Sequence, residues 1–221
     1  MKKLLFFILA TTLLFGCGEW VDTNDLVSGN AKPDSGSDSP GNEAELITYK
    51  VGDYYNVNGK EGVVFEVWND GLNGKIVSLD QTSLPWCTYE QFKKNIEIGA
   101  SSETDGYINT LFIINREDCK EYPAFVWCRE HGDEWYMPAI EEVKLIVFNQ
   151  AVRNAVNKTL KRLGATELYT PEIYHYYWSS TENTSYFALG VFTSSNSHRS
   201  EVINKSSTNE SLFSVRAICR F

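Results

Sequence analysis

The residues best suited to perform chemistry lie in one short stretch, in which three hydroxyl side chains precede a carboxylate. They follow the large aromatic Trp178 directly and are Ser179, Ser180, Thr181 and Glu182. A hydroxyl nucleophile needs a base and an orienting group within hydrogen-bond reach, and a glycosidase needs a second carboxylic acid. The sequence identifies neither partner, because the three histidines are scattered at His131, His175 and His198. We therefore expect no catalytic residue and no enzyme activity.

The cysteines and histidines do not have the spacing of a metal site. Apart from Cys17, the chain has four cysteines, without a C-x-x-C pair: Cys87, Cys119, Cys128 and Cys219. An even number of cysteines in an exported chain favours two disulfides, and three pairings are open at this point. We expect no metal and no other cofactor.

The first 45 residues predict export and anchoring. Residues 1–16 combine two lysines with an apolar run that is too short to cross a bilayer, which is typical of a signal peptide. Residues 14–17 resemble the cleavage box of bacterial lipoproteins, in which the cysteine (here Cys17) is lipidated; an ordinary secretory peptide is the alternative. Residues 17–45 are rich in Ser, Gly, Asn, Asp and Pro and are expected to form a flexible tether. One domain is expected over residues 46–221.

The charge balance argues against two classes of partner. The chain has 20 Lys and Arg against 29 Asp and Glu; without Lys2 and Lys3 of the signal peptide it would have 18 against 29, a net charge of −11. Because no cluster of Lys and Arg stands out along the sequence, nucleic acid and anionic lipid headgroups are poor candidates. We expect contact with the membrane through the lipid anchor only.

Local patterns predict strands, then helices, then strands again. Residues 54–57 and 62–68 flank Asn58 and Gly59, which predicts a hairpin, and residues 75–79 extend it into an antiparallel meander. Helices are predicted within residues 86–98, at 108–114 (where a strand is the alternative), at 123–130, from Pro138 onward and at 150–163. Four strands follow, at about residues 176–180, 186–192, 201–205 and 212–221. This order predicts an α+β domain with a largely antiparallel sheet.

Three motifs resemble a known family. They are residues 135–138 with Glu142, residues 177–182, and residues 215–217, and they are similar to motifs of the Lcl C-terminal domain family. Members are exported bacterial proteins of unknown function with a C-type-lectin-like fold, and the N-terminal region resembles that of Bacteroidetes-type lipoproteins. The resemblance implies a C-type-lectin-like α+β domain, with an antiparallel sheet and two to three helices, preceded by the meander. It also implies a disulfide between Cys128 and Cys219, which leaves Cys87 and Cys119 to form the second disulfide.

The motif residues are expected to form the framework of the domain: Trp135, Pro138, Glu142, Trp178, Ser179, Ser180, Thr181 and Glu182. The stretch that follows is the better candidate for binding, because 19 of the 37 residues from 178 to 214 are Ser, Thr or Asn, interleaved with aromatic and basic side chains. Such a composition is typical of adaptable recognition surfaces, although long solvated loops share it. We predict ligand contacts by Asn183, Tyr186, Asn196, His198, Arg199, Asn204 and Lys205.

The calcium-dependent sugar site of C-type lectins is not expected. The tripeptides Glu-Pro-Asn and Gln-Pro-Asp do not occur, and Trp68, Asn69 and Asp70 fall in the opening meander. The leading hypothesis is an outer-membrane lipoprotein, exposed at the cell surface, whose adhesin-like module binds a glycan or a host or partner protein. A structural or accessory subunit at a fimbrial tip is the alternative, and a periplasmic enzyme is a weaker one.

Overall fold

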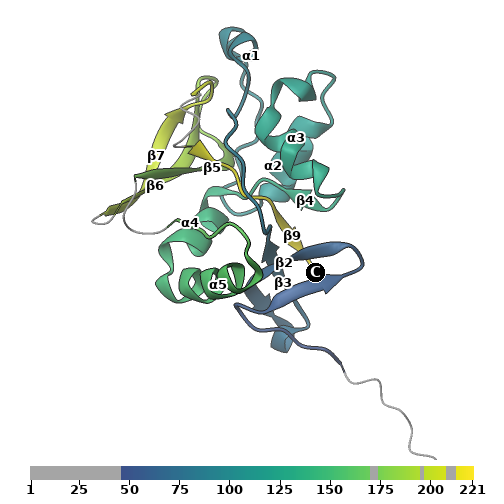
Figure 1. Cartoon of the computed structure of the whole chain (residues 1–221). Helices are drawn as coiled ribbons and strands as arrows, with labels where there is room; N and C mark the ends of the chain where they lie inside the picture. Colours follow the sequence, from purple (N-terminus) through teal and green to yellow (C-terminus); the bar gives the residue numbers. More distant parts are fainter. Residues whose placement is uncertain (1–45, 170–173, 195–196, 208–212) are drawn as a thin grey trace, which may run out of the picture. The chain divides into compact units, whose positions relative to one another are not determined.

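The computed structural model describes residues 46–169, 174–194, 197–207 and 213–221. Residues 44–221 form one compact unit, whose described part contains two β-sheets and five α-helices (Figure 1). The predicted α+β class is therefore confirmed. The expectation of two to three helices was too low. None of the described helices is long and apolar enough to cross a membrane.

The first sheet contains the predicted meander and the end of the chain. Its strands are β1 (Tyr54–Val57), β2 (Lys60–Trp68), β3 (Asn73–Val77), β4 (Trp135–Tyr136) and β9 (Ile218–Arg220), in the antiparallel order β1-β2-β3-β9-β4. Asn58 and Gly59 have φ angles of 53° and 79°, the left-handed values that a two-residue hairpin turn requires. Strand β9 lies between β3 and β4, so the last residues of the chain join segments that are distant in sequence.

The five helices are α1 (Tyr89–Lys93), α2 (Gly106–Ile114), α3 (Pro123–Glu130), α4 (Ile140–Phe148) and α5 (Gln150–Leu163). Helix α5 has the predicted bounds because Asn149 caps its first amides and Gly164, at φ 68°, ends it. Helix α4 begins two residues after Pro138, since the Glu142 carboxylate accepts a hydrogen bond from the Ala139 N–H at 2.8 Å and makes Ala139 the N-cap.

The second sheet has the order β7-β6-β5-β8, with β5 (His175–Glu182), β6 (Phe187–Ser194), β7 (Ser197–Asn204) and β8 (Phe213–Ser214). The β5–β8 pair is parallel, so the sheet is mixed. The predicted strand over residues 212–221 is wrong as one element, because β8 and β9 belong to different sheets. Between them, Ala217 exchanges hydrogen bonds with Ser78, and the buried Arg216 guanidinium bonds the Ser78 carbonyl at 2.8 Å.

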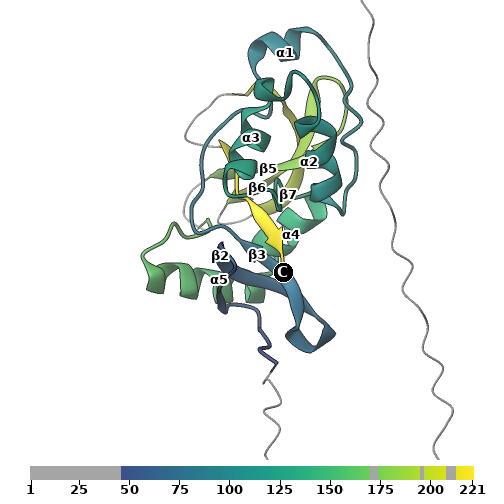
Figure 2. The ribbon, with the colours of Figure 1, turned by 90° about the vertical axis from the view of Figure 1, so that its right-hand side faces the viewer.

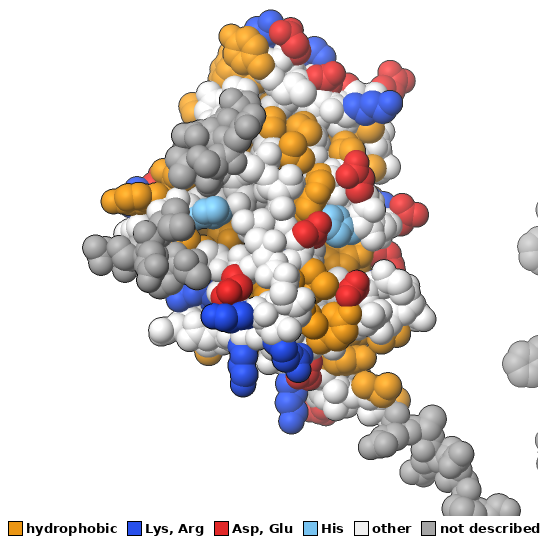
Figure 3. Space-filling model, viewed as in Figure 1, with side chains coloured by type: hydrophobic (Ala, Val, Ile, Leu, Met, Phe, Trp, Pro, Cys, Tyr) orange, Lys and Arg blue, Asp and Glu red, His pale blue; other side chains and the backbone are white. Residues whose placement is uncertain are grey.

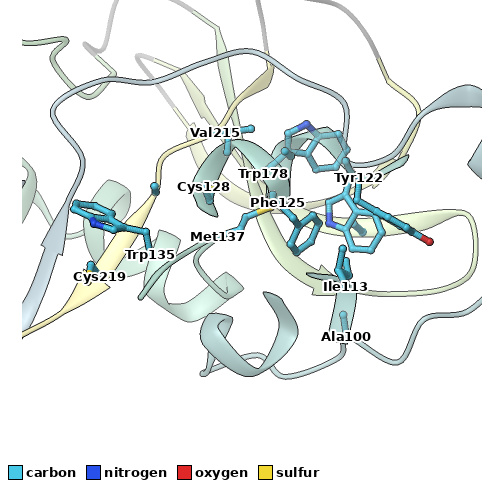
Figure 4. Close-up of a cluster of buried hydrophobic side chains, with 14 of the residues drawn as sticks. Ala100, Ile113, Tyr122, Phe125, Cys128, Trp135, Met137, Trp178, Val215 and Cys219 are labelled. Carbon is cyan, nitrogen blue, oxygen red and sulfur yellow. The ribbon is translucent and has the colours of Figure 1, made fainter. Parts of the chain in front are cut away.

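Large aromatic side chains form much of the core. Trp86, Tyr122, Phe125 and Trp178 are 0–1% exposed and belong to one cluster with Met137 and Cys128 (Figure 4). A second cluster packs the buried faces of α4 and α5 against β2 and β3. Figures 1 and 2 agree in placing α1 at one end of this unit and α5, together with the β2–β3 hairpin, towards the other.

Candidate binding surface

The stretch from Trp178 to Glu182 is buried throughout and bonded to the backbone of other elements. Each of its five side chains is at most 6% exposed. The Trp178 indole N–H donates to the Leu84 carbonyl at 3.1 Å, and the Ser179 hydroxyl donates to the Leu189 carbonyl at 2.7 Å. The Thr181 hydroxyl accepts from the Ile140 N–H at 3.1 Å. These hydroxyls satisfy buried backbone groups and do not open to solvent.

The motif of residues 135–138 and Glu142 contacts this stretch in the fold. The Pro138 carbonyl accepts a hydrogen bond from the Ser180 N–H at 2.8 Å, and Trp135 is buried in the core cluster. The Glu142 carboxylate accepts from the Gly106 N–H at 3.1 Å and pairs with the Lys75 ammonium at 3.1 Å. Glu142 thereby holds together the beginnings of α2 and α4.

Lys205, predicted as a ligand contact, lies in the interior and cannot reach a surface ligand. It is 1% exposed, and its ammonium lies 2.5 Å from the Glu182 carboxylate and 4.6 Å from the centre of the Trp86 ring. Glu182 also accepts hydrogen bonds from the Ile98 and Gly99 N–H groups, at 2.8 and 2.6 Å. Burial lowers the pKa of Lys205, and the hydrogen bond to Glu182 opposes that shift. The pair is structural.

The remaining predicted contact residues form two groups at opposite ends of the β6–β7 hairpin. Asn183, Tyr186 and Asn204 lie near the Phe187–Asn204 pair, whereas His198 and Arg199 lie near the Thr193–His198 pair. Six residue steps separate the two pairs, which is about 20 Å in a strand. Asn196 lies outside the described residues. The predicted residues therefore do not converge on one site.

The group at the β6–β7 turn end consists of side chains that already have intramolecular partners. His198 stacks on Phe148 with ring centres 5.7 Å apart, and burial and the charge of Arg153 lower its pKa. The Arg199 guanidinium lies 4.4 Å from the centre of the Phe192 ring and bonds Glu201 at 2.5 Å. Both residues lie on β7, the strand at the edge of the second sheet.

Tyr186 of the other group belongs to a row of aromatic rings at the surface, which we call the aromatic platform: the exposed Tyr89 and Tyr186 and the half-buried Phe92. Tyr89 stacks on Phe92 at 6.2 Å, and Phe92 meets Tyr186 edge to face at 5.2 Å. Tyr89 is 62% and Tyr186 is 39% exposed. The exposed Asn183 lies in the same β5–β6 turn as Tyr186. The contacts predicted from the sequence include Tyr186 and Asn183 but not the helix α1 residues, although Tyr89 and Phe92 have helical spacing after the cap residue Thr88.

The disulfides that the resemblance implied are not formed in the structure. Cys87, Cys119, Cys128 and Cys219 are all free thiols. Burial raises the pKa of the Cys87 and Cys219 thiols to about 11. Among residues 46–169, 174–194, 197–207 and 213–221, no group of three His, Cys, Asp or Glu side chains could hold a metal ion.

The fold and this surface define an α+β domain with two sheets and an exposed aromatic platform. It is similar to the crystal structure of a fimbrial protein from Bacteroides ovatus, with a TM-score of 0.54 and 18% sequence identity. The similarity covers 78% of this chain but only 49% of the fimbrial protein, so the chain spans about half the length of that neighbour. At this identity the likeness concerns the fold alone. No family model and no curated protein sequence matches the chain.

Proposed function

We propose that this chain is an exported, non-catalytic binding module that recognises a glycan at the cell surface without calcium. The aromatic platform is the observation that carries this proposal. The proposed C-type-lectin-like fold is supported by the meeting of two of its motifs, at Pro138 and Ser180. Lipidation at Cys17 would anchor the module to the outer membrane.

The platform has the chemistry of a sugar-binding surface. The apolar face of a sugar ring stacks on an aromatic ring, and its hydroxyls bond to neighbouring polar groups. Tyr89 and Tyr186 offer exposed rings with phenolic hydroxyls, and Asn183 offers an exposed amide. Lys93 lies 5.1 Å from the centre of the Tyr89 ring and pairs with Glu90 at 2.8 Å, which holds a charged group beside the platform.

A glycan array probed with the full chain tests this proposal, with the affinity of each hit measured for single variants. Tyr89→Ala and Tyr186→Ala should each weaken binding about five- to tenfold, since one aromatic contact contributes about 1 kcal/mol. Tyr174→Ala is the matched control, because this tyrosine is 67% exposed and stacks on Phe192 instead. Equal losses for the control and the platform variants would contradict the assignment. If the chain bound a protein through the platform and bound no glycan, the site would be correct but its ligand would be a protein.

A structural or accessory subunit of a fimbria is the second candidate, and the fold of the Bacteroides ovatus neighbour favours it. The edge strand β7 suits such a role, because in the described sheet it pairs with β6 on one side only. Crosslinking in intact cells followed by affinity capture separates the two candidates. A stoichiometric pilin partner crosslinked at β7 supports the fimbrial role, and capture without any pilin argues against it.

A further inference from the structure

We propose that the end of the domain formed by helix α5 and the first described residues docks on an anionic lipid bilayer through the phosphate headgroups. This surface lies apart from the aromatic platform, and its test involves no glycan. The inference corrects the expectation that no cluster of Lys and Arg stands out, because four cationic residues and no acidic one fall within residues 150–163.

Helix α5 presents a basic face. It has four cationic residues and no acidic one: Arg153, Lys158, Lys161 and Arg162. At 100° per residue these four fall within half of the helix circumference, and the buried Val152, Val156, Thr159 and Leu160 occupy the opposite side. Figure 3 shows Lys and Arg side chains gathered over this end of the domain, with a few acidic side chains beside them. Without α5 the chain has 16 positive against 29 negative groups, so the helix is a basic surface on an acidic protein.

The cations of this face are available to a ligand. Lys158, Lys161 and Arg162 are exposed, as is the nearby Lys50, and none of the four forms an ion pair within the described part of the chain. Lys158 and Arg162 line a surface hollow of about 330 Å³ together with residues 51–53. Asp53 is the acid in this lining, and its carboxylate accepts a hydrogen bond from the Lys50 N–H at 2.8 Å. Lys161 and Arg162 lie in the last turn of α5, where their charges also stabilise the negative end of the helix dipole. Lys50 and Lys158 lie outside this turn, so the helix dipole does not account for them.

The neighbouring apolar residues favour a bilayer as the occupant. Leu46 and Ile47, where the described chain begins, are 73% and 71% exposed. Five residues further on, the chain reaches α5, where the Thr159 hydroxyl donates to the Gly52 carbonyl at 2.6 Å. A bilayer places phosphates directly above an apolar layer, so it matches cations and apolar side chains at once. Helix α1 lies at the opposite end in both ribbon views, so this orientation would direct the aromatic platform away from the membrane (Figures 1 and 2).

Amine labelling of the full chain on vesicles tests the proposal. Vesicles of phosphatidylcholine are compared with vesicles that also contain phosphatidylglycerol, and the labelled lysines are identified by peptide mass. Labelling of Lys158 and Lys161 should fall severalfold on the anionic vesicles only and recover at high salt, because surface electrostatics are screened. Lys93 on α1 is the internal control and should label equally on both.

A matched pair of triple variants provides the second readout. K158Q/K161Q/R162Q should weaken binding to anionic vesicles about a hundredfold at low salt, since one cation near such a surface contributes about fivefold. K93Q/K94Q/K120Q removes the same charge from exposed positions elsewhere and should weaken binding much less. Equal effects of the two variants, or unchanged labelling of Lys158 on anionic vesicles, would overturn the proposal. Protection of Lys158 by a soluble acidic protein, but not by vesicles, would overturn it as well.

Discussion

At the scale of single residues, the ion pair between Lys205 and Glu182 shows how the fold accommodates charge in its interior. A buried pair is tolerated only where further hydrogen bonds satisfy both ions. Glu182 has the Ile98 and Gly99 N–H groups, and Lys205 donates to the Ser185 carbonyl at 3.1 Å. The two groups should therefore act as a unit.

A double-mutant cycle tests this coupling. Glu182→Gln should lower the free energy of unfolding by about 3–5 kcal/mol, because it leaves the Lys205 ammonium buried without a counter-ion. Lys205→Met should cost less, since the Glu182 carboxylate keeps its two backbone donors. In urea unfolding, the double variant should lose about 1–3 kcal/mol less free energy of unfolding than the two single variants lose together. Additivity within about 0.5 kcal/mol would show that the two side chains do not act as a pair.

At the scale of elements, local sequence signals predicted which helices and turns form, but not which residues of distant elements contact one another. The Asn58 and Gly59 turn, Pro123 at the start of α3 and Gly164 at the end of α5 act within a few residues, so the sequence reveals them. The burial of Lys205 depends on Glu182 and on Trp86, which is more than a hundred residues away. The contact of Phe92 with Tyr186 likewise crosses the fold. Binding residues chosen from composition alone were therefore scattered over two surfaces.

The close approach of the start of α2 to residues 137–139, just before α4, requires that residue 106 has no side chain. A Cβ atom there would overlap the Met137 carbonyl oxygen and lie 2.5 Å from the Ala139 nitrogen. Gly106→Ala should lower the free energy of unfolding by about 3 kcal/mol in urea, because backbone groups cannot move aside cheaply. Gly59→Ala is the comparison: φ is 79° there, nothing lies within 4 Å of the added atom, and the cost should be about 1 kcal/mol of backbone strain. A smaller loss for Gly106→Ala than for Gly59→Ala would contradict the packing argument.

At the scale of the whole molecule, the two proposed surfaces define how the domain would be oriented on a membrane. The basic face of α5 and the aromatic platform at α1 lie at opposite ends of the compact unit (Figures 1 and 2). The proposed glycan binding at a membrane would require this separation, because a platform that faced the bilayer could not reach a ligand outside it. The buried motifs between them hold the two ends in a fixed relation.

The last nine residues connect both sheets, so their removal should affect the whole domain. Strand β8 pairs with β5, and Cys219 on β9 pairs with Ile76 on one side and Trp135 on the other. A chain that ends at residue 212 loses the strand between β3 and β4, together with the buried Val215 and Ile218. We expect it to lose cooperative unfolding in urea and much of its strand signal in circular dichroism, because the β1–β3 meander and β4 are then no longer joined. Arg220→Ala, which shortens a partly exposed side chain and keeps the strand, should unfold cooperatively with a stability within about 1 kcal/mol of the parent chain. A cooperative unfolding transition in the truncated chain would show that β8 and β9 are not needed to hold the rest of the domain together.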